Sequence, residues 1–319
     1  MHSTDSKRSS SMNGISAQLG LRVRLRRLKP NELPHHPELA SLQSFSKPCD
    51  PKTFARDVLA EAEIFTTEYW PKKFKVKSSS KSSPPAKAPV ELSGHEVDVN
   101  EMPDGVRGGA ISGTAETWFA RSSVHENKAE RGTAEWSEFE KYLLDDHSEH
   151  EKEYTPAVYD AHKVLGWGST NLEGITGWEK VEMAIFEMCH SLPTPLNNRV
   201  FSVLVVKARS TSSQPSFLTV QIPVDLSQVP VALYSNGRHK EEGKFDQRKQ
   251  VTPGIYVSVE RAELIDDGSK VKWQMTTASD AKGVLPLWAQ KLGVPGAVVK
   301  DVGLFMDWVD LKREGMTWT

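Results

Sequence analysis

A basic side chain and an imidazole share one face of a predicted strand near the middle of the chain. In the segment Glu116–His125, strand alternation places Arg121 and His125 on the same face. A carboxylate from another central strand, Glu187 or Glu260, could pair with Arg121 there, because an unpaired buried charge is strongly destabilising. Such a cluster could bind the polar end of a ligand or could fix the register of the strands, and the sequence leaves both interpretations open.

Histidine and cysteine occur in two other places that invite a chemical interpretation. His147, His150 and Glu151 lack the spacing of the zinc-protease motif, so the sequence predicts a solvated charged face or a mobile loop there and no metal site. His190 follows Cys189 at the end of a predicted strand. Nucleophilic catalysis by this pair would need an orienting third group, which the sequence cannot place.

The common catalytic signatures are missing from the chain. It has no G-x-S-x-G nucleophile elbow, phosphate-loop signature, dinucleotide fingerprint or paired cysteines with zinc spacing. We therefore expect no cofactor and no catalytic residue, and we favour a binding protein over an enzyme. The alternative is a small-molecule cyclase or isomerase in which Arg121, His125, Glu187 and His190 supply acid–base groups.

Composition narrows the classes of partner. The chain has 319 residues, with 40 Lys and Arg against 42 Asp and Glu, so its net charge of -2 gives no global field for nucleic acid. Two cysteines cannot form a disulfide framework, which favours a cytoplasmic location. No apolar run has the length of a membrane span or of a signal peptide, so we expect a soluble protein.

The second half of the chain predicts an antiparallel sheet. Five β-branched, mostly alternating runs follow one another without helices between them, which is typical of a meander and not of βαβ units. These runs are Trp178–His190, Arg199–Ala208, Phe217–Val224, Ile255–Ile265 and Val271–Thr277.

Helices are predicted before and after these strands. One begins with Asp50 as N-cap and Pro51 as first residue and ends near Trp70, and a second spans Ala134–Asp145. At the C-terminal end, a short helical pattern around Trp288 is followed by a break at 293–296 and then by a longer helix. The apolar stripe of that longer helix consists of Val298, Val302, Phe305 and Val309, so we expect it to pack on the sheet.

The predicted domain organisation is a single unit with a tail. Residues 1–50 are Ser-rich, then Pro- and His-rich, and predict a mostly flexible extension. Residues 51–314 are expected to form one domain, with disordered insertions near 78–89, where Ser, Lys and Pro dominate, and near 235–252.

Several segments carry a family resemblance. The run SDAKGVLPLWAQKLGVPGAVVKDV (279–302) resembles the C-terminal signature of START lipid-transfer domains, especially the phosphatidylcholine-transfer branch. The run LPTPLNNRVFSVLV (192–205) is similar to their Pro-x-x-x-Asn-Arg turn and strand. Together with WFARSSVH (118–125), HSEHEKEYTP (147–156) and YVSVE (256–260), the pattern is similar to a fungal START-like family of unassigned role, over about residues 51–312.

The resemblance implies an α+β, helix-grip (START / Bet v 1-like) fold, in which a curved antiparallel sheet surrounds a cavity closed by a long C-terminal helix. It implies binding, transfer or sensing of a lipid or other hydrophobic metabolite, with transient membrane contact. Arg199 stands in the Asn-Arg motif and could hold a phosphate or carboxylate head group, or could instead anchor the turn by an internal salt bridge. An adaptor that docks through the basic loop Arg238–Lys249 is a third hypothesis.

The candidate cavity residues combine the polar set with apolar side chains from the strands and the last helices. They are Trp118, Arg121, His125, Glu187, His190, Arg199, Gln221, Tyr256, Glu260, Trp273, Met275, Trp288 and Phe305.

Overall fold

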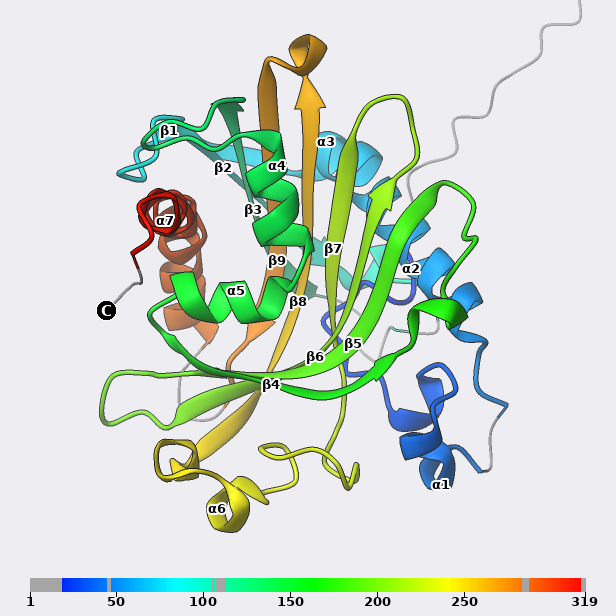
Figure 1. Ribbon diagram of the computed structural model, residues 1–319. Helices are drawn as coiled ribbons and strands as arrows, with labels where there is room; N and C mark the ends of the chain where they lie inside the picture. Colours follow the sequence, from blue (N-terminus) through cyan, green and yellow to red (C-terminus); the bar gives the residue numbers. More distant parts are fainter. Residues whose placement is uncertain (1–18, 45–46, 105, 107–112, 283–286, 317–319) are drawn as a thin grey trace, which may run out of the picture.

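The computed structural model describes residues 19–44, 47–104, 106, 113–282 and 287–316. Within these ranges the strands form one nine-stranded sheet in the order β1-β2-β3-β9-β8-β7-β6-β5-β4 (Figure 1). Neighbours are antiparallel, and the start of β8 also pairs in parallel with the start of β6. The strands are β1 Lys75–Lys81, β2 Val90–Asp98, β3 Thr114–Glu126, β4 Val158–Trp167, β5 Trp178–His190, β6 Asn198–Ser210, β7 Ser216–Pro223, β8 Val251–Ile265 and β9 Lys270–Asp280.

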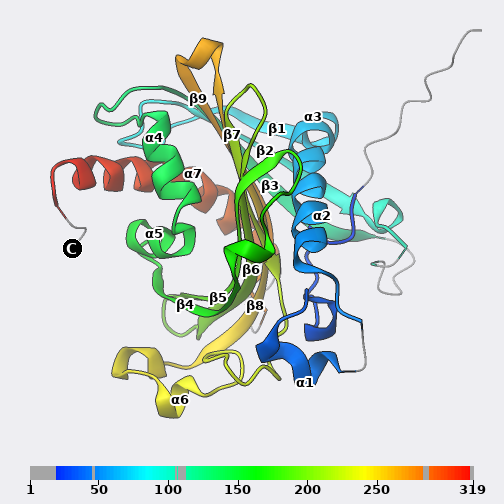
Figure 2. The ribbon, with the colours of Figure 1, turned by 45° about the vertical axis from the view of Figure 1, so that its right-hand side comes forward.

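Helices cover both faces of the sheet (Figure 2). On the front face lie α4 (Trp136–Phe139), α5 (His147–Tyr154) and the long α7 (Leu287–Arg313). On the back face, α2 (Pro51–Ile64) continues through a π-helical turn into α3 (Trp70–Lys73). The short helices α1 (Ala40–Gln43) and α6 (His239–Glu242) lie near one end of the sheet.

Two apolar layers hold these helices against the sheet. On the back face, Phe54 and Val58 of α2 belong to a core cluster with Leu204 and Val220 of the central strands. On the front face, α4 and α7 meet the sheet in a second cluster that includes Trp273. Every residue of β7 is buried, as expected for a strand covered on both sides.

The α+β helix-grip prediction is confirmed by this architecture. All five strands of the predicted meander are present, with β5 at the predicted bounds, and β3 contains the predicted strand 116–125. No bounds are predicted from sequence for β1, β2 and β4. The helix predicted over 51–70 is also present as α2 and its π-helical continuation, and the helix predicted over 134–145 is present as α4 and the turn after it.

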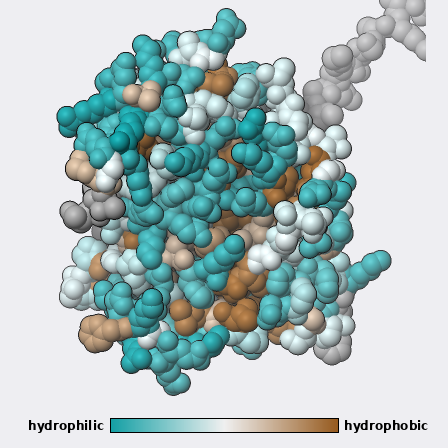
Figure 3. Space-filling model, viewed as in Figure 1, coloured by the Kyte–Doolittle hydropathy of each residue, from teal (hydrophilic) through white to brown (hydrophobic). Residues whose placement is uncertain are grey.

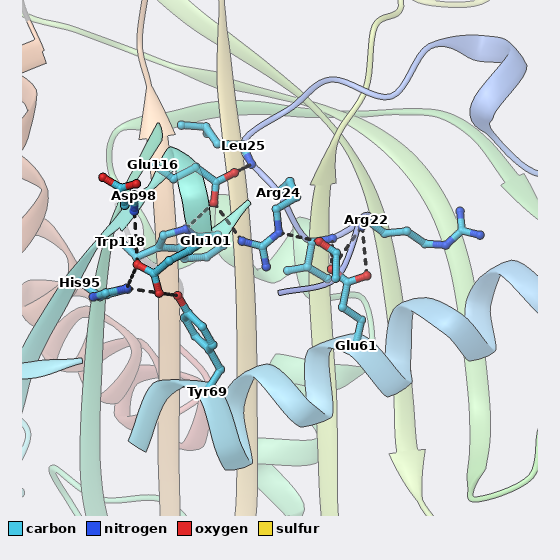
Figure 4. A network of polar contacts seen from close by, with 12 residues as sticks. Arg22, Arg24, Leu25, Glu61, Tyr69, His95, Asp98, Glu101, Glu116 and Trp118 are labelled. Carbon is cyan, nitrogen blue, oxygen red and sulfur yellow. Dashed lines mark hydrogen bonds and ion pairs between the residues drawn. The ribbon is translucent and has the colours of Figure 1, made fainter. Parts of the chain in front are cut away.

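The N-terminal residues differ from the predicted flexible extension wherever they are described. Val23, Leu28 and Leu33 are buried in the back-face cluster. Figure 4 shows the polar contacts that hold this segment: Arg24 Nη1 lies 3.0 Å from Glu116 Oε2 of β3, and Glu61 of α2 accepts hydrogen bonds from two backbone N–H groups of the segment. Residues 19–44 are therefore part of the folded unit, and residues 1–18 lie outside the described residues.

Both predicted disordered insertions are ordered in the structure. Residues 75–81 form the edge strand β1, and the following turn packs on α7, where Ser83 Oγ donates to Val299 O at 2.7 Å and accepts from Gly303 N–H at 2.8 Å. The segment 235–252 contains α6 and a 3-10 turn at Phe245–Arg248 and leads into β8. Both segments contact residues far away along the chain, in part through side chains such as Ser83 and Gln247, and composition does not reveal such contacts.

Two further predictions about helices are corrected. Residues 147–154 form α5 and not a mobile loop, with His147 and Tyr154 buried. The predicted break at 293–296 is absent, because α7 runs through Pro295 as one helix. Of the helices in the described residues, none is both long and apolar enough to cross a membrane.

Candidate functional site

A cavity of about 610 Å³ lies between the front face of the sheet, α5 and α7. Its volume is in the range of small-molecule sites. Apolar side chains make up much of the wall, and polar side chains gather where α5 meets the central strands. Among the described residues, the lining includes Arg121, His147, Glu151, Tyr154, Met188, His190, Phe201, Gln221, Tyr256, Glu260, Trp273, Met275, Ala297 and Asp301.

Arg121 and Glu260 form a buried ion pair in this wall. Both residues lie opposite Met275 of the intervening strand β9, so they face each other across it. Arg121 Nη2 lies 3.2 Å from Glu260 Oε1, and its guanidinium stacks 3.9 Å from the ring centre of Trp273. The indole Nε1 of Trp273 donates to the same Glu260 oxygen at 2.8 Å. The pair is thus held on three adjacent strands.

Helix α5 adds a second polar group from above the sheet. His147 and Glu151 are four residues apart and face the cavity, with Nε2 and Oε2 3.7 Å apart. His147 Nδ1 lies 2.9 Å from Leu143 O, so that nitrogen carries the proton of the neutral ring. Its Nε2 then accepts from Gln221 Nε2 at 3.2 Å.

Burial sets the protonation of these groups. It lowers the pKa of His147 to about 3, an effect strengthened by the ammonium of Lys207. Burial raises the pKa of Glu151 to about 8, with the carboxylates of Asp301 and Glu260 adding repulsion. The pKa of Asp301 is raised to about 6, also by burial. At neutral pH the cavity therefore holds a neutral imidazole and a largely protonated Glu151 beside the Arg121–Glu260 pair.

Some polar atoms in this wall have unused hydrogen-bonding capacity. Among the described residues, Arg121 Nε and Nη1 find no acceptor, and Glu151 Oε2 finds no hydrogen-bond partner. Buried polar atoms are normally paired. The wall thus offers two donors and one carboxyl oxygen to a molecule inside the cavity.

Seven of the thirteen candidate residues lie around this one cavity. Their contact with a ligand stays a prediction, but the structure brings them together: Arg121, His190, Gln221, Tyr256, Glu260, Trp273 and Met275.

Three further candidates are packed elsewhere in the described structure. Trp118 lies on the back face, where its indole Nε1 donates to Glu116 and its ring is 4.8 Å from that of Phe65. His125 is on the front face but beyond the cavity, buried beside Phe139 and 2.8 Å from Ser123 Oγ. Phe305 belongs to the apolar cluster under α7.

The remaining polar candidates bind backbone. Glu187 points to the opposite face from Met188 and accepts three N–H groups of residues 233–235 at 2.7–3.0 Å. Arg199 donates to the carbonyl oxygens of Ala281 at 2.6 Å and Lys282 at 3.2 Å, so it anchors a turn through carbonyls and not through a salt bridge. The side chain of Trp288 lies outside the described residues.

The structure separates the four acid–base residues that the enzyme alternative requires. Of its four acid–base residues, Arg121 and His190 line the cavity, whereas His125 and Glu187 lie elsewhere. The four do not converge on one point.

The contribution of α5 to the cavity wall was not predicted from the sequence. His147, Glu151 and Tyr154 recur at spacings of four and three, which is one face of a helix. That signal was present but was obscured by the charged composition of 147–154. Among the described residues no group of three or more His, Cys, Asp or Glu could hold a metal ion.

Comparison with known proteins gives a family and a fold. The model of a family described as "Protein of unknown function (DUF3074)" matches residues 118–309. No curated protein matches the chain in sequence.

Among solved structures, human StAR-related lipid transfer protein 5 is 10% identical with a TM-score of 0.52, covering 83% of this chain and 99% of its own. Human STARD10 is 13% identical with a TM-score of 0.48, covering 84% of each chain. The human StarD13 (DLC2) lipid transfer and protein localization domain is 14% identical with a TM-score of 0.45, covering 76% of this chain and 93% of its own. At such identities the likeness to StAR-related lipid transfer protein 5 establishes the fold alone.

Proposed function

The chain belongs to the DUF3074 family, and from its helix-grip fold we propose that it binds a lipid or other hydrophobic small molecule in the cavity beneath α7. A human protein of the same fold is described as a lipid transfer protein, and we extend that class of ligand to this chain. The free cysteines, Cys49 and the buried Cys189, fit the cytoplasmic location that we propose for it.

The observation that carries this proposal is the contrast inside the cavity. Its wall is largely apolar, yet Arg121 and Glu151 keep polar atoms without partners there. A ligand with an apolar body and a polar end would fill the space, and its polar end would form hydrogen bonds with these atoms. No described protein group forms them. We propose that the polar end lies between Arg121 and Glu151 and that it carries acceptor oxygens, which the guanidinium and the protonated Glu151 carboxyl can both bond.

The experiment that tests this function is native mass spectrometry of the purified protein, followed by lipid extraction. We expect a bound lipid that is released on denaturation, with phosphatidylcholine as the first candidate because of the C-terminal motif. Ala297→Trp, which fills the cavity from α7, should abolish loading, whereas Val124→Trp, at an exposed apolar position outside the cavity wall, should retain it. A protein that carries no lipid and takes none up from vesicles would contradict the proposal.

We further propose that loading involves transient contact with a membrane through the loop around α6. Phe245 is 94% exposed, and Lys240, Lys244, Arg248 and Lys249 around it are also exposed. Hydrophobic atoms protrude on this lower side of the molecule (Figure 3). Such a combination suits an anionic lipid surface. Phe245→Ser should slow lipid uptake from anionic vesicles without preventing loading; an unchanged rate would exclude this loop from the contact.

A further inference from the structure

A second cavity, of about 440 Å³, lies on the other side of His147 from the ligand cavity. It is bounded by the start of α5 and by β4, β5 and β6, and His147 lines both cavities. Its apolar walls include Trp167, Phe186 and Val205. The proposed lipid function makes no use of this space.

The deepest charged group of the second cavity is a lysine. The side chain of Lys207 on β6 is only 10% exposed, and its ammonium lies 3.1 Å from Glu182 Oε2. Glu182 is itself 60% exposed, so most of its charge is met by water. An ammonium group has three donors, and buried lysines normally have well-formed partners. The positive charge of Lys207 is therefore only partly balanced by Glu182 inside the cavity.

The start of α5 lines the same cavity. The residue before the helix, Asp146, has a left-handed backbone (φ 43°), and its side chain makes no capping hydrogen bond. The N–H groups of the first turn consequently lack the usual side-chain acceptor. Independently, the hydroxyl of Ser148 lines this cavity, is 1% exposed, and has no hydrogen-bond partner among the described residues.

The acidic groups of this cavity lie at its rim. Asp146 and Glu149 are exposed, as is the basic Lys163, so water solvates all three. Depth thus separates the charges: the buried groups are donors and a cation, and the carboxylates are at the surface.

We infer that the second cavity binds a small oxyanion, a carboxylate or a phosphate group, between the start of α5, Ser148 and Lys207. The oxygen atoms of such a group accept from backbone N–H, hydroxyl and ammonium together, which is the pattern seen at anion sites on helix N-termini. The apolar wall formed by Trp167 and Phe186 leaves room for a short organic substituent.

An anion bound at this site would change the electrostatic environment of His147, which also lines the ligand cavity. The ammonium of Lys207 helps to lower the pKa of that imidazole, and an anion beside the ammonium would offset the effect. Glu151 and Glu260 face this ring from the ligand cavity, with oxygens 3.7 and 3.8 Å from its two nitrogens, so a change of charge beside Lys207 would reach the ligand cavity through this side chain. The anion site and the ligand site are thus joined by one side chain.

The test is calorimetric titration of the full chain with inorganic phosphate and, separately, acetate, at constant ionic strength held with sodium chloride. We expect saturable binding of at least one probe, weakened about tenfold in Lys207→Met and several-fold in Ser148→Ala. Lys272→Met, which removes a lysine from a partly buried ion pair between β9 and β8, is the matched control and should leave binding unchanged.

NMR of the His147 ring locates the site, because its signals should shift with the same saturation curve. Tighter binding of phosphate assigns a phosphate-type ligand, and tighter binding of acetate assigns a carboxylate. The inference is overturned if neither probe saturates, if Lys207→Met binds as wild type does, or if the His147 signals do not move.

Discussion

Among the described residues, Arg121 forms its ion pair with one carboxylate, Glu260, and both members of the pair are buried. A buried ion pair contributes little net stability compared with apolar packing, but removing one member leaves the other as an uncompensated charge. The stacking on Trp273 and the bond from its indole to Glu260 fix the geometry of the pair. Both interpretations of the cluster, head-group binding and strand register, therefore make separable predictions.

Arg121→Met should lower the free energy of unfolding by about 3–5 kcal/mol, because Glu260 loses its ion pair inside the protein. The double variant Arg121→Met/Glu260→Gln should recover most of that loss, since it removes both charges. Urea denaturation of the three proteins measures the stabilities, and lipid extraction measures loading. Lost stability with unchanged lipid loading in Arg121→Met would assign the pair to strand register, whereas lost loading in the stable double variant would assign it to head-group binding.

At the same scale, the sequence predicted Glu187 or Glu260 as the partner of Arg121, and the structure selects Glu260; the residues of α5 that complete the cavity were not predicted. Alternation along a strand fixes which residues share a face, which is why seven candidates surround one cavity. It does not fix how far along the sheet each helix lies, so His125 was expected beside a ligand and lies beside Phe139 instead. His147 and Glu151 were missed because their helix is polar in composition and is ordered by packing on the sheet.

Elements with a strong apolar period were predictable from sequence, and those held by long-range polar contacts were not. The strands β5 to β9 are β-branched and alternate, and the structure contains them all. In contrast, β1 is a mostly exposed edge strand of Lys and Ser, and its order depends on pairing with β2. The N-terminal segment depends likewise on Arg24 meeting Glu116, which lies 92 residues further along the chain.

The docking of α7 depends on a glycine. A Cβ atom at Gly303 would lie 2.4 Å from Pro84 O and 2.6 Å from Ser83 O, so any side chain there must push the helix away from the β1–β2 turn. The same helix contains Gly296, where a Cβ atom would meet nothing within 4 Å. The two glycines form a matched pair on the element that covers the ligand cavity.

Gly303→Ala should therefore destabilise the protein by about 1–3 kcal/mol through overpacking. Gly296→Ala should stabilise it by up to about 1 kcal/mol, because alanine is the better helix former. Urea denaturation gives both values, and hydrogen exchange of α7 should be faster in Gly303→Ala only. Equal behaviour of the two variants would show that the turn at Ser83 does not position α7.

At the scale of the whole molecule, pH acts on stability through two opposing sets of buried groups in and beside the cavity. Burial lowers the pKa of His125 and His147 to about 3 and of His190 to about 4, so the folded protein keeps these rings neutral. As pH falls below about 6.5, the unfolded chain binds protons that the folded protein does not, and stability decreases. This acid-side loss requires no change in the fold.

Glu151 acts in the opposite direction. Its pKa is raised from 4.5 to about 8, so between these values the unfolded chain releases a proton that the folded protein retains. Stability contributed by the protonated carboxyl is complete below about pH 4.5 and is lost as pH rises towards 8.

Glu151→Gln removes this ionisation while keeping the shape of the side chain. Its free energy of unfolding relative to wild type should therefore rise between pH 5 and pH 8, by at most about 1.4 kcal/mol per pH unit. Urea denaturation at several pH values measures the difference, with Glu149→Gln, at an exposed position of the same helix, as the matched control. A difference that stays constant with pH would mean that Glu151 ionises as freely in the folded protein as in the unfolded chain. The cavity would then present a carboxylate and not a hydrogen-bond donor to its ligand at neutral pH.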